Sequence, residues 1–218
     1  MKKLKKGILI AIEGIDGSGK STFIKELAPL LEKDFNLLLT KESGGSKLGK
    51  YIHDIVQNQP VNVTPKAEYL LFAADRAQHI AEVVEPALKK HQLVISDRMG
   101  DSSVVYQGFA RGLGSSIIDT INLWAMNNIQ PHLVFYIKID PAQAIKRFHH
   151  RQHECKEDLT VFEKEKQCFM QKVSEGYDIW FKDKKNVFIL DGTKPAKVLA
   201  QEAQVYLDHW LSKEKLYE

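Results

Sequence analysis

The chain has 218 residues, of which 44% are hydrophobic and 27% are charged, and its formal net charge is +3. This length suits one globular domain with a substantial core, and no run of about twenty apolar residues is present to indicate a membrane protein. The net charge is small, so it does not indicate a nucleic-acid-binding protein. The basic residues 1–6 are followed by a short apolar stretch that runs into Glu13 and a glycine-rich loop, with no small-residue cleavage site, and we therefore expect no signal peptide.

Five short apolar runs suit buried strands, at residues 8–12, 37–39, 93–95, 133–139 and 187–190. Segments with helical spacing lie between them, at 67–90, 116–127 and 195–211, and a further helix is expected to open at Lys20. Because strands alternate with helices, we predict one α/β domain over residues 1–218, in three layers, with a five-stranded parallel sheet flanked by helices. Ligands of such folds bind beyond the carboxyl ends of the strands.

The strongest motif is GIDGSGKS at residues 14–21, which follows the first apolar run and precedes a helix. This is the pattern and context of a phosphate-binding P-loop, in which glycines let backbone N–H groups surround the phosphates of a nucleotide. Lys20 is expected to face solvent and to reach the β and γ phosphates, and Ser21 is expected to supply a hydroxyl to Mg²⁺. The predicted fold is therefore that of a P-loop NTPase, with nucleotide contacts from Gly14, Gly17, Ser18, Gly19, Lys20, Ser21 and Thr22. The chain lacks the N-K-x-D motif that reads guanine, which weighs against a GTPase.

A second group of polar residues, Asp97 and Arg98, follows the apolar run at 93–95. A carboxylate at the end of a strand can hold the water shell of phosphate-bound Mg²⁺, so Asp97 is a candidate for the metal site together with Ser21. Arg98 can clamp the phosphate of an acceptor through its planar guanidinium. An ordinary surface ion pair is the alternative interpretation of the same two residues.

The segment at 149–158 differs in composition from the rest of the chain, because it is almost entirely polar and has no apolar face to bury. It can be a solvated helix end or a mobile lid, and we expect a short lid at about 147–160. The two cysteines, Cys155 and Cys168, both lie in a charged region that we expect to be helical, so a disulfide framework is implausible. This cysteine content favours a reducing compartment, so we expect a cytoplasmic protein.

Several motifs, taken in order, resemble those of the thymidylate kinase family. KESGG at 41–45 resembles its phosphate-binding R-E-P-G-G segment, and YLLFAADRAQH at 69–79 resembles the helix that builds its base pocket. DR at 97–98, with SS at 102–103 and YQG at 106–108, resembles its second signature. With the P-loop, the similarity spans residues 8–112, and it resumes at 162–163, 175–177 and 190–193.

The resemblance implies an enzyme that transfers the γ-phosphoryl group of ATP to dTMP, giving dTDP and ADP in dTTP synthesis, with Mg²⁺ as cofactor. It also implies a homodimer packed through helices. From the small net charge and the lack of a long apolar run, we expect no nucleic-acid or membrane partner. An acceptor phosphate is already anionic at neutral pH, so we do not expect Glu13 to act as a base. Positioning and charge neutralisation are expected to account for catalysis.

The resemblance further assigns roles in the acceptor pocket. Phe72 would stack on thymine and Arg76 would donate to the thymine O4. Taken alone, Phe72 is more typical of a core aromatic residue, and the alternative for Arg76 is a solvated helix cation. Their spacing of four places both on one helix face. The remaining implied contacts are Ser102 and Gln107 with the base, Tyr106 with the deoxyribose, Asp16 with the 3′-hydroxyl, and Lys41 and Arg98 with the phosphate.

The chain departs from the family pattern in the acceptor segment and in the lid. Lys41 and Ser43 replace the usual arginine and proline of R-E-P-G-G, so the cation at position 41 lacks a bidentate fork. The usual D-R-x-E of the lid lacks its arginine, and Gly17 stands where some members carry a catalytic arginine. The predicted catalytic residues are therefore Lys20, Arg98 and two arginines at the start of the lid, Arg147 and Arg151.

Two other functions remain compatible with these motifs. A deoxynucleoside kinase would accept a neutral nucleoside and would need a carboxylate base beside its 5′-hydroxyl, where this chain offers the cations Lys41 and Arg98. A nucleotide-binding module without turnover is favoured only by the altered lid.

Overall fold

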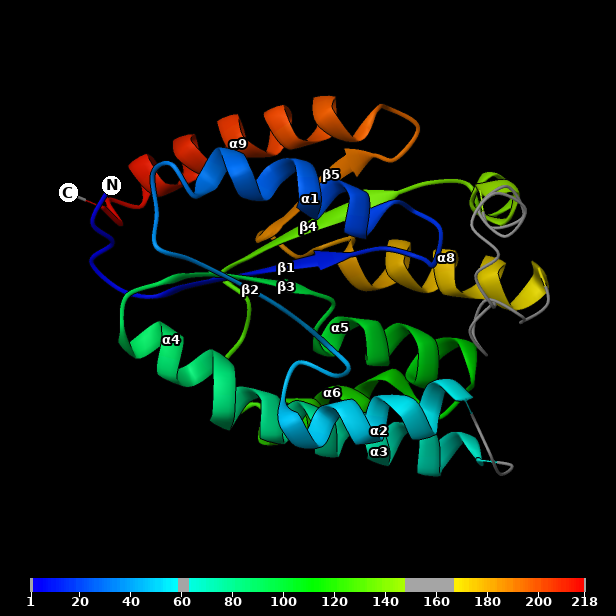
Figure 1. Cartoon of the computed structure of the whole chain (residues 1–218). Coiled ribbons are helices and arrows are strands. Elements are labelled where there is room, and N and C mark those ends of the chain that lie inside the picture. Colours follow the sequence, from blue (N-terminus) through cyan, green and yellow to red (C-terminus); the bar gives the residue numbers. More distant parts are fainter. Residues whose placement is uncertain (1, 59–62, 148–166, 218) are drawn as a thin grey trace.

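The computed structural model describes residues 2–58, 63–147 and 167–217. Five strands form one sheet in the order β2-β3-β1-β4-β5, and every neighbouring pair is parallel (Figure 1). The predicted five-stranded parallel sheet is therefore confirmed. The strands are β1 (Ile8–Glu13), β2 (Leu37–Lys41), β3 (Leu93–Asp97), β4 (Leu133–Lys138) and β5 (Val187–Asp191).

The sheet lies between two layers of helices. One face is covered by α1 (Lys20–Leu31) and α9 (Ala196–Lys213), and the remaining labelled helices lie on the other face (Figure 1). Alternate residues of β1 enter the two cores: Ile8, Ile10 and Ile12 pack with the α1 and α9 side, whereas Leu9 and Ala11 pack with the opposite layer. Both faces are apolar, which explains why the strand reads as a continuous hydrophobic run.

The second layer holds most of the helices. They are α2 (Lys47–Asn58), α3 (Pro65–His79), η1 (Ile80–Val84), α4 (Glu85–Lys89), α5 (Gly100–Ser103), η2 (Val104–Ala110), α6 (Ser115–Ala125) and α8 (Gln167–Phe181). Residues 141–147 are also helical. The helix expected at 67–90 is present as α3, η1 and α4 in succession, and the π-helical segment η1 lies inside it. Cys168 lies in α8, so the helix expected around it is confirmed there, whereas α2 was not predicted.

None of the helices in the described ranges is long and apolar enough to span a bilayer. The described residues also leave out most of the expected lid, because Arg151 and Cys155 both lie in the segment 148–166. The lid itself therefore remains a prediction.

Candidate active site

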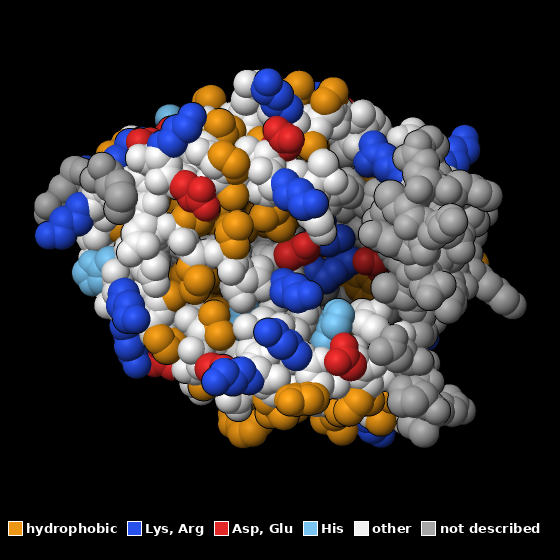
Figure 2. Space-filling model, viewed as in Figure 1, with side chains coloured by type: hydrophobic (Ala, Val, Ile, Leu, Met, Phe, Trp, Pro, Cys, Tyr) orange, Lys and Arg blue, Asp and Glu red, His pale blue; other side chains and the backbone are white. Residues whose placement is uncertain are grey.

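A cavity of about 430 Å³ opens at the carboxyl ends of β1, β2 and β3, where the sequence places the P-loop and the two other motifs. Lys, Arg, Asp and Glu side chains gather around its mouth (Figure 2). Its walls come from the P-loop, the loop after β2, α2, α3 and the segment after β3. The predicted site residues that line it are Asp16, Gly17, Gly19, Lys20, Ser21, Thr22, Lys41, Phe72, Arg76, Asp97, Arg98, Ser102, Tyr106, Gln107 and Arg147.

The P-loop turns directly into α1. Gly19 has φ +96°, a left-handed conformation that favours glycine, and Lys20 begins the helix behind it. Lys20 Nζ donates to the carbonyl oxygens of Gly14 at 3.1 Å and Ile15 at 3.0 Å, and only 7% of the residue is exposed. The expectation that Lys20 faces solvent is therefore wrong, because the loop folds its carbonyls over the ammonium group. Burial, followed by the nearby Arg98, lowers the pKa of Lys20 to about 8.

Ser21 and Asp97 meet beside the P-loop. The Ser21 hydroxyl donates to Asp97 Oδ2 at 3.2 Å, and both residues line the cavity. One carboxylate and one hydroxyl, beside a loop that binds phosphates, suit Mg²⁺, which prefers oxygen ligands and shares its shell with waters and substrate phosphates. The two residues predicted for the metal site therefore lie together, with oxygen chemistry that fits this ion.

Arg98 is the centre of the next group of contacts. Its backbone is left-handed (φ +69°), and its guanidinium donates to Gly14 O and Ser102 Oγ, both at 2.9 Å, and pairs with the Asp16 carboxylate. The Tyr106 hydroxyl donates to Asp16 Oδ2 at 3.0 Å. Although burial raises the pKa of Asp16, Arg98 and Lys20 outweigh it and hold that pKa below its usual value. Asp16, Arg98, Ser102 and Tyr106, which the sequence predicted for the acceptor, thus form one network.

Glu13, at the end of β1, is hydrogen-bonded to this network through Ser102. Its carboxylate accepts hydrogen bonds from Met99 N at 2.8 Å, Ser102 Oγ at 2.6 Å and the Tyr177 hydroxyl at 2.8 Å. Burial, and after it the charge of Asp101, raises the pKa of Glu13 to about 7. Met99 and Ser102 lie in the segment after β3 and Tyr177 lies in α8, so Glu13 joins these two segments, and it is not among the residues that line the cavity.

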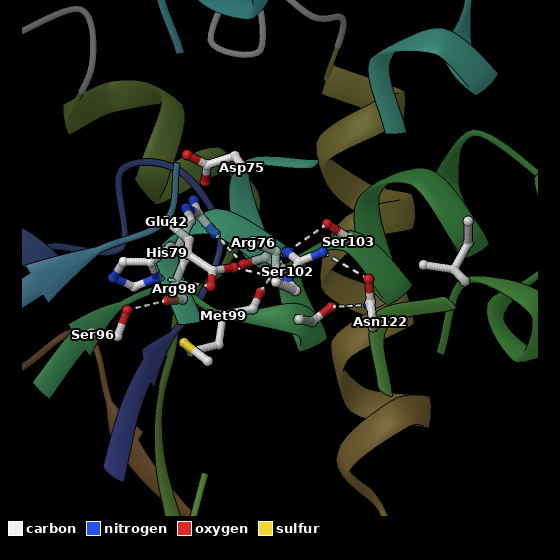
Figure 3. A network of polar contacts seen from close by, with 12 residues as sticks. Glu42, Asp75, Arg76, His79, Ser96, Arg98, Met99, Ser102, Ser103 and Asn122 are labelled. Atoms are coloured by element: carbon white, nitrogen blue, oxygen red, sulfur yellow. Dashed lines mark hydrogen bonds and ion pairs between the residues drawn. The ribbon is translucent and has the colours of Figure 1, made fainter. Parts of the chain in front are cut away.

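Arg76 lines the cavity, is only 2% exposed, and belongs to a network of polar contacts (Figure 3). Its Nε donates to Glu42 Oε2 at 2.8 Å, Nη1 donates to Asn122 Oδ1 at 2.7 Å, and Nη2 donates to Ser103 Oγ at 3.0 Å. The alternative of a solvated helix cation is therefore excluded. These partners fix the plane of the guanidinium before any ligand binds.

Two further residues of this network, Glu42 and His79, were not among the predicted site residues. Glu42 Oε1 lies 3.0 Å from His79 Nδ1 (Figure 3), and His79 Nε2 lies 2.6 Å from Thr40 Oγ1. Burial raises the pKa of Glu42, but Arg76 and His79 outweigh it and hold that pKa below the usual value. The signal for both was present in the sequence, because Glu42 lies in the 41–45 motif and His79 lies in the 69–79 motif.

The other predicted residues occupy the walls and the mouth. Phe72 is half-buried against the cavity, and Gln107 is buried with its amide nitrogen 2.9 Å from Glu68 Oε1. Lys41 is exposed at the end of β2. Arg147 lies against the P-loop, because its guanidinium donates to Gly192 O at 2.9 Å and Ser18 O at 3.4 Å.

Comparisons with known proteins agree on one family. The sequence model of the thymidylate kinase family matches residues 12–203. The chain is 42% identical to a thymidylate kinase of Thermosipho africanus over 86% of its length and 90% of the relative, and 37% identical to one of Thermosipho melanesiensis over 94% and 99%. The solved thymidylate kinase of Ehrlichia chaffeensis superposes with a TM-score of 0.74 at 26% identity, covering 93% of this chain and 98% of that one. The chain belongs to the thymidylate kinase family, whose members use ATP to phosphorylate dTMP to dTDP.

Proposed function

We propose that the protein is a dTMP kinase that transfers the γ-phosphoryl group of ATP to dTMP, giving dTDP and ADP for dTTP synthesis. The observation that carries this proposal is the single cavity that joins the P-loop to Phe72, Arg76 and Arg98. ATP would occupy the P-loop side and dTMP the other. This arrangement brings the phosphates of the two substrates together between Lys20 and Arg98.

The acceptor phosphate attacks the γ-phosphorus in line, and it needs no strong base because it is already anionic. Arg98 and Lys41 orient this phosphate, and Phe72 provides an aromatic face for thymine. Tyr106 would lie against the deoxyribose, and Asp16 would accept a bond from its 3′-hydroxyl. The hydrogen bonds among Arg98, Asp16 and Tyr106 hold these groups in place before the substrate arrives, which favours catalysis by positioning.

We propose Mg²⁺ as the cofactor, held by Ser21, by Asp97 through its water shell, and by the phosphates of ATP. When bound, the ion neutralises the charge that develops on the transferring phosphoryl group. Lys20 contributes a fixed positive charge on the same side of the cavity, and Arg147 contributes another from the helical segment 141–147.

The acceptor itself separates dTMP kinase from the nearest rival, a deoxynucleoside kinase. Four carboxylates line the cavity, and two of them are ion-paired: Asp16 with Arg98, and Glu42 with Arg76 and His79. Asp75 accepts a hydrogen bond from Gly44 N, and Asp97 accepts one from Ser21 at the proposed metal site, so each of the four already has a partner. We expect ADP release with dTMP as acceptor and none above background with thymidine. Equal rates with both acceptors in a coupled assay would contradict the assignment of Arg98 and Lys41 to an acceptor phosphate.

Substitution of Arg76 by alanine is expected to weaken dTMP binding by about 1.5 to 3 kcal/mol, the range for hydrogen bonds to charged groups, with ATP affinity nearly unchanged. It should also lower the free energy of unfolding by about 3 kcal/mol, because the buried Glu42 carboxylate loses a charged partner. Calorimetric titration with each ligand and chemical denaturation measure the two effects. Lys66→Ala, which removes an exposed cation from the same helix, is the control and should change neither quantity. Equal losses for dTMP and ATP would show that Arg76 does not belong to the acceptor pocket.

We propose a homodimer that packs through α2, α3 and α6. Large apolar side chains are exposed on these three neighbouring helices, including Tyr51 at 71%, Ile117 at 57% and Trp124 at 79%. Figure 2 shows hydrophobic side chains along the lower edge, where Figure 1 places α2 and α3. An exposed apolar patch of this kind is typical of a protein interface.

Substitution of Trp124 by glutamate is expected to convert the dimer to monomers, because it replaces the most exposed of the large apolar side chains of this patch by a charge. Sedimentation analysis of purified protein measures the mass. Val205→Glu is the matched control, since Val205 is also 71% exposed but lies on α9, on the opposite face of the sheet. If Trp124→Glu kept the mass of the wild-type protein, the interface would have to be sought elsewhere.

We propose a cytoplasmic location, with neither nucleic acid nor a membrane as partner. Among the described residues, Cys168 is a free and exposed thiol, which suits a reducing compartment. The small net charge of +3 gives no reason to expect a polyanionic partner.

A further inference from the structure

Ser43 is one of the two departures from the R-E-P-G-G pattern, and the structure shows what it contacts. Its Oγ lies 2.8 Å from Nδ1 of His53, a residue of α2. Both residues line the cavity on its acceptor side. A proline at position 43 would offer no hydroxyl for this bond, so the departure at 43 and the histidine at 53 form a pair.

Gly44 lies between His53 and Lys41. The backbone of Gly44 is left-handed (φ +93°), and a Cβ built there would lie 3.3 Å from His53 Cβ and 3.6 Å from Lys41 Cε. The imidazole and the lysine stem therefore flank the same glycine. Because Ser43 Oγ is the hydrogen-bond partner of His53 Nδ1, Nε2 is the ring nitrogen that could donate a hydrogen bond to a ligand.

We propose that His53, oriented by Ser43, is an additional binding residue for the acceptor phosphate, and that it takes up a proton when that phosphate binds. This inference rests on the proposed function, in which Lys41 and Arg98 hold the phosphate of dTMP. Lys41 supplies one charge without the fork of an arginine. A protonated His53 supplies a second charged donor at the same place, which offsets that loss.

The charges around His53 determine when it is protonated. Burial, followed by the charge of Lys41, lowers the pKa of His53 below its usual value, while Asp54 on the same helix opposes this effect. Asp75 and Arg76 of α3, and Arg98 after β3, line the same cavity. Near neutral pH the imidazole of the free protein is therefore mostly uncharged. A phosphate dianion beside it favours the charged form, so binding raises the pKa and draws a proton from solvent.

The sign of the pH dependence follows from these two states. Because His53 binds more protons with dTMP present than without it, dTMP affinity must fall as the pH rises between the pKa of the free protein and the higher pKa of the complex. The phosphate of dTMP also titrates in this range. His53→Arg corrects for this effect, since arginine keeps a cation at position 53 that does not titrate.

Calorimetric titration of dTMP into the full-length protein near pH 7, in two buffers with different ionisation enthalpies, counts the protons exchanged. We expect the wild type to take up more protons per dTMP than either His53→Gln or His53→Arg. His53→Gln should weaken dTMP binding about tenfold or more. His53→Arg should bind within about threefold of the wild type near pH 7. From about pH 6 to about pH 8, the wild type should lose affinity relative to His53→Arg.

Two further variants separate this role from a structural one. Ser43→Ala should reduce proton uptake and affinity, whereas Ser43→Thr, which keeps the hydroxyl, should restore both. His209→Gln changes an exposed histidine on α9, across the sheet from the cavity, and should match the wild type. Wild-type proton uptake and affinity in His53→Gln would overturn the inference while leaving dTMP binding intact. A wild-type protein that bound no dTMP at all would instead contradict the proposed function.

Discussion

Replacement of Lys20 by alanine is expected to lower kcat by at least about a hundredfold, the scale seen when one preorganised charge is removed from an active site. Lys20 is held by the carbonyls of Gly14 and Ile15 at the start of α1, so its ammonium group is fixed where the β and γ phosphates of ATP are expected. The loss should fall on kcat because the charge on these oxygens grows in the transition state. Steady-state kinetics with saturating ATP and dTMP measure it.

Because Lys20 is buried, the alanine variant also removes packing, and a fold control is required. Lys20→Met keeps the length of the side chain and removes only its charge. We expect the same loss of kcat in both variants, with a thermal midpoint for Lys20→Met close to that of the wild type. Near-normal turnover in a folded Lys20→Met protein would show that the phosphate-transfer site lies elsewhere.

Substitution of Arg147 by methionine is the second large effect that we expect. Its guanidinium donates to Gly192 O and Ser18 O, which places a positive charge against the P-loop from outside it. The loop itself has Gly17 where an arginine could stand, so the charge that develops between the two phosphates needs a cation from another segment. An arginine in this role contributes about 10³ to 10⁵ in rate. We therefore expect kcat to fall by at least about a hundredfold, with little change in dTMP affinity.

Lys146→Met is the matched control, because Lys146 is an exposed cation one residue away in the same helical segment. It should keep kcat within about twofold of the wild type, the scale of a surface charge. Arg151 lies outside the described residues, so Arg151→Met and the double variant decide how the two arginines share the role. If both single variants and the double variant kept wild-type turnover, these arginines would be ordinary surface cations.

The sheet was predictable from the sequence because both of its faces are covered. Residues 8–12 and 93–95 read as uninterrupted apolar runs, and each became a strand buried on both sides. The helix α2 was not predicted, although the sequence carries its signal. Leu48, Tyr51, Ile52, Ile55 and Val56 recur at the spacing of one helix face, the pattern by which an amphipathic helix is recognised.

The identity of many site residues was also predictable, but their environment was not. The motifs indicate both Lys20 and Arg76 as site residues. The sequence nevertheless suggests that Lys20 faces solvent, and a solvated helix cation is the alternative for Arg76. Their burial depends on partners far away in the chain, such as Asn122 for Arg76. The contact between Ser43 and His53 could not be predicted either, because a single sequence does not reveal that the loop after β2 folds against α2.

The central claim, that one cavity transfers phosphate from ATP to dTMP, is tested most directly by following the label of γ-labelled ATP. The wild-type protein is incubated with Mg²⁺, labelled ATP and one acceptor at a time: dTMP, dUMP, AMP, GMP, CMP or thymidine. We expect the label to appear in dTDP at the highest rate by far, and none in thymidine phosphate. Label that remained in ATP with every acceptor would contradict the account, and so would faster transfer to a ribonucleotide than to dTMP.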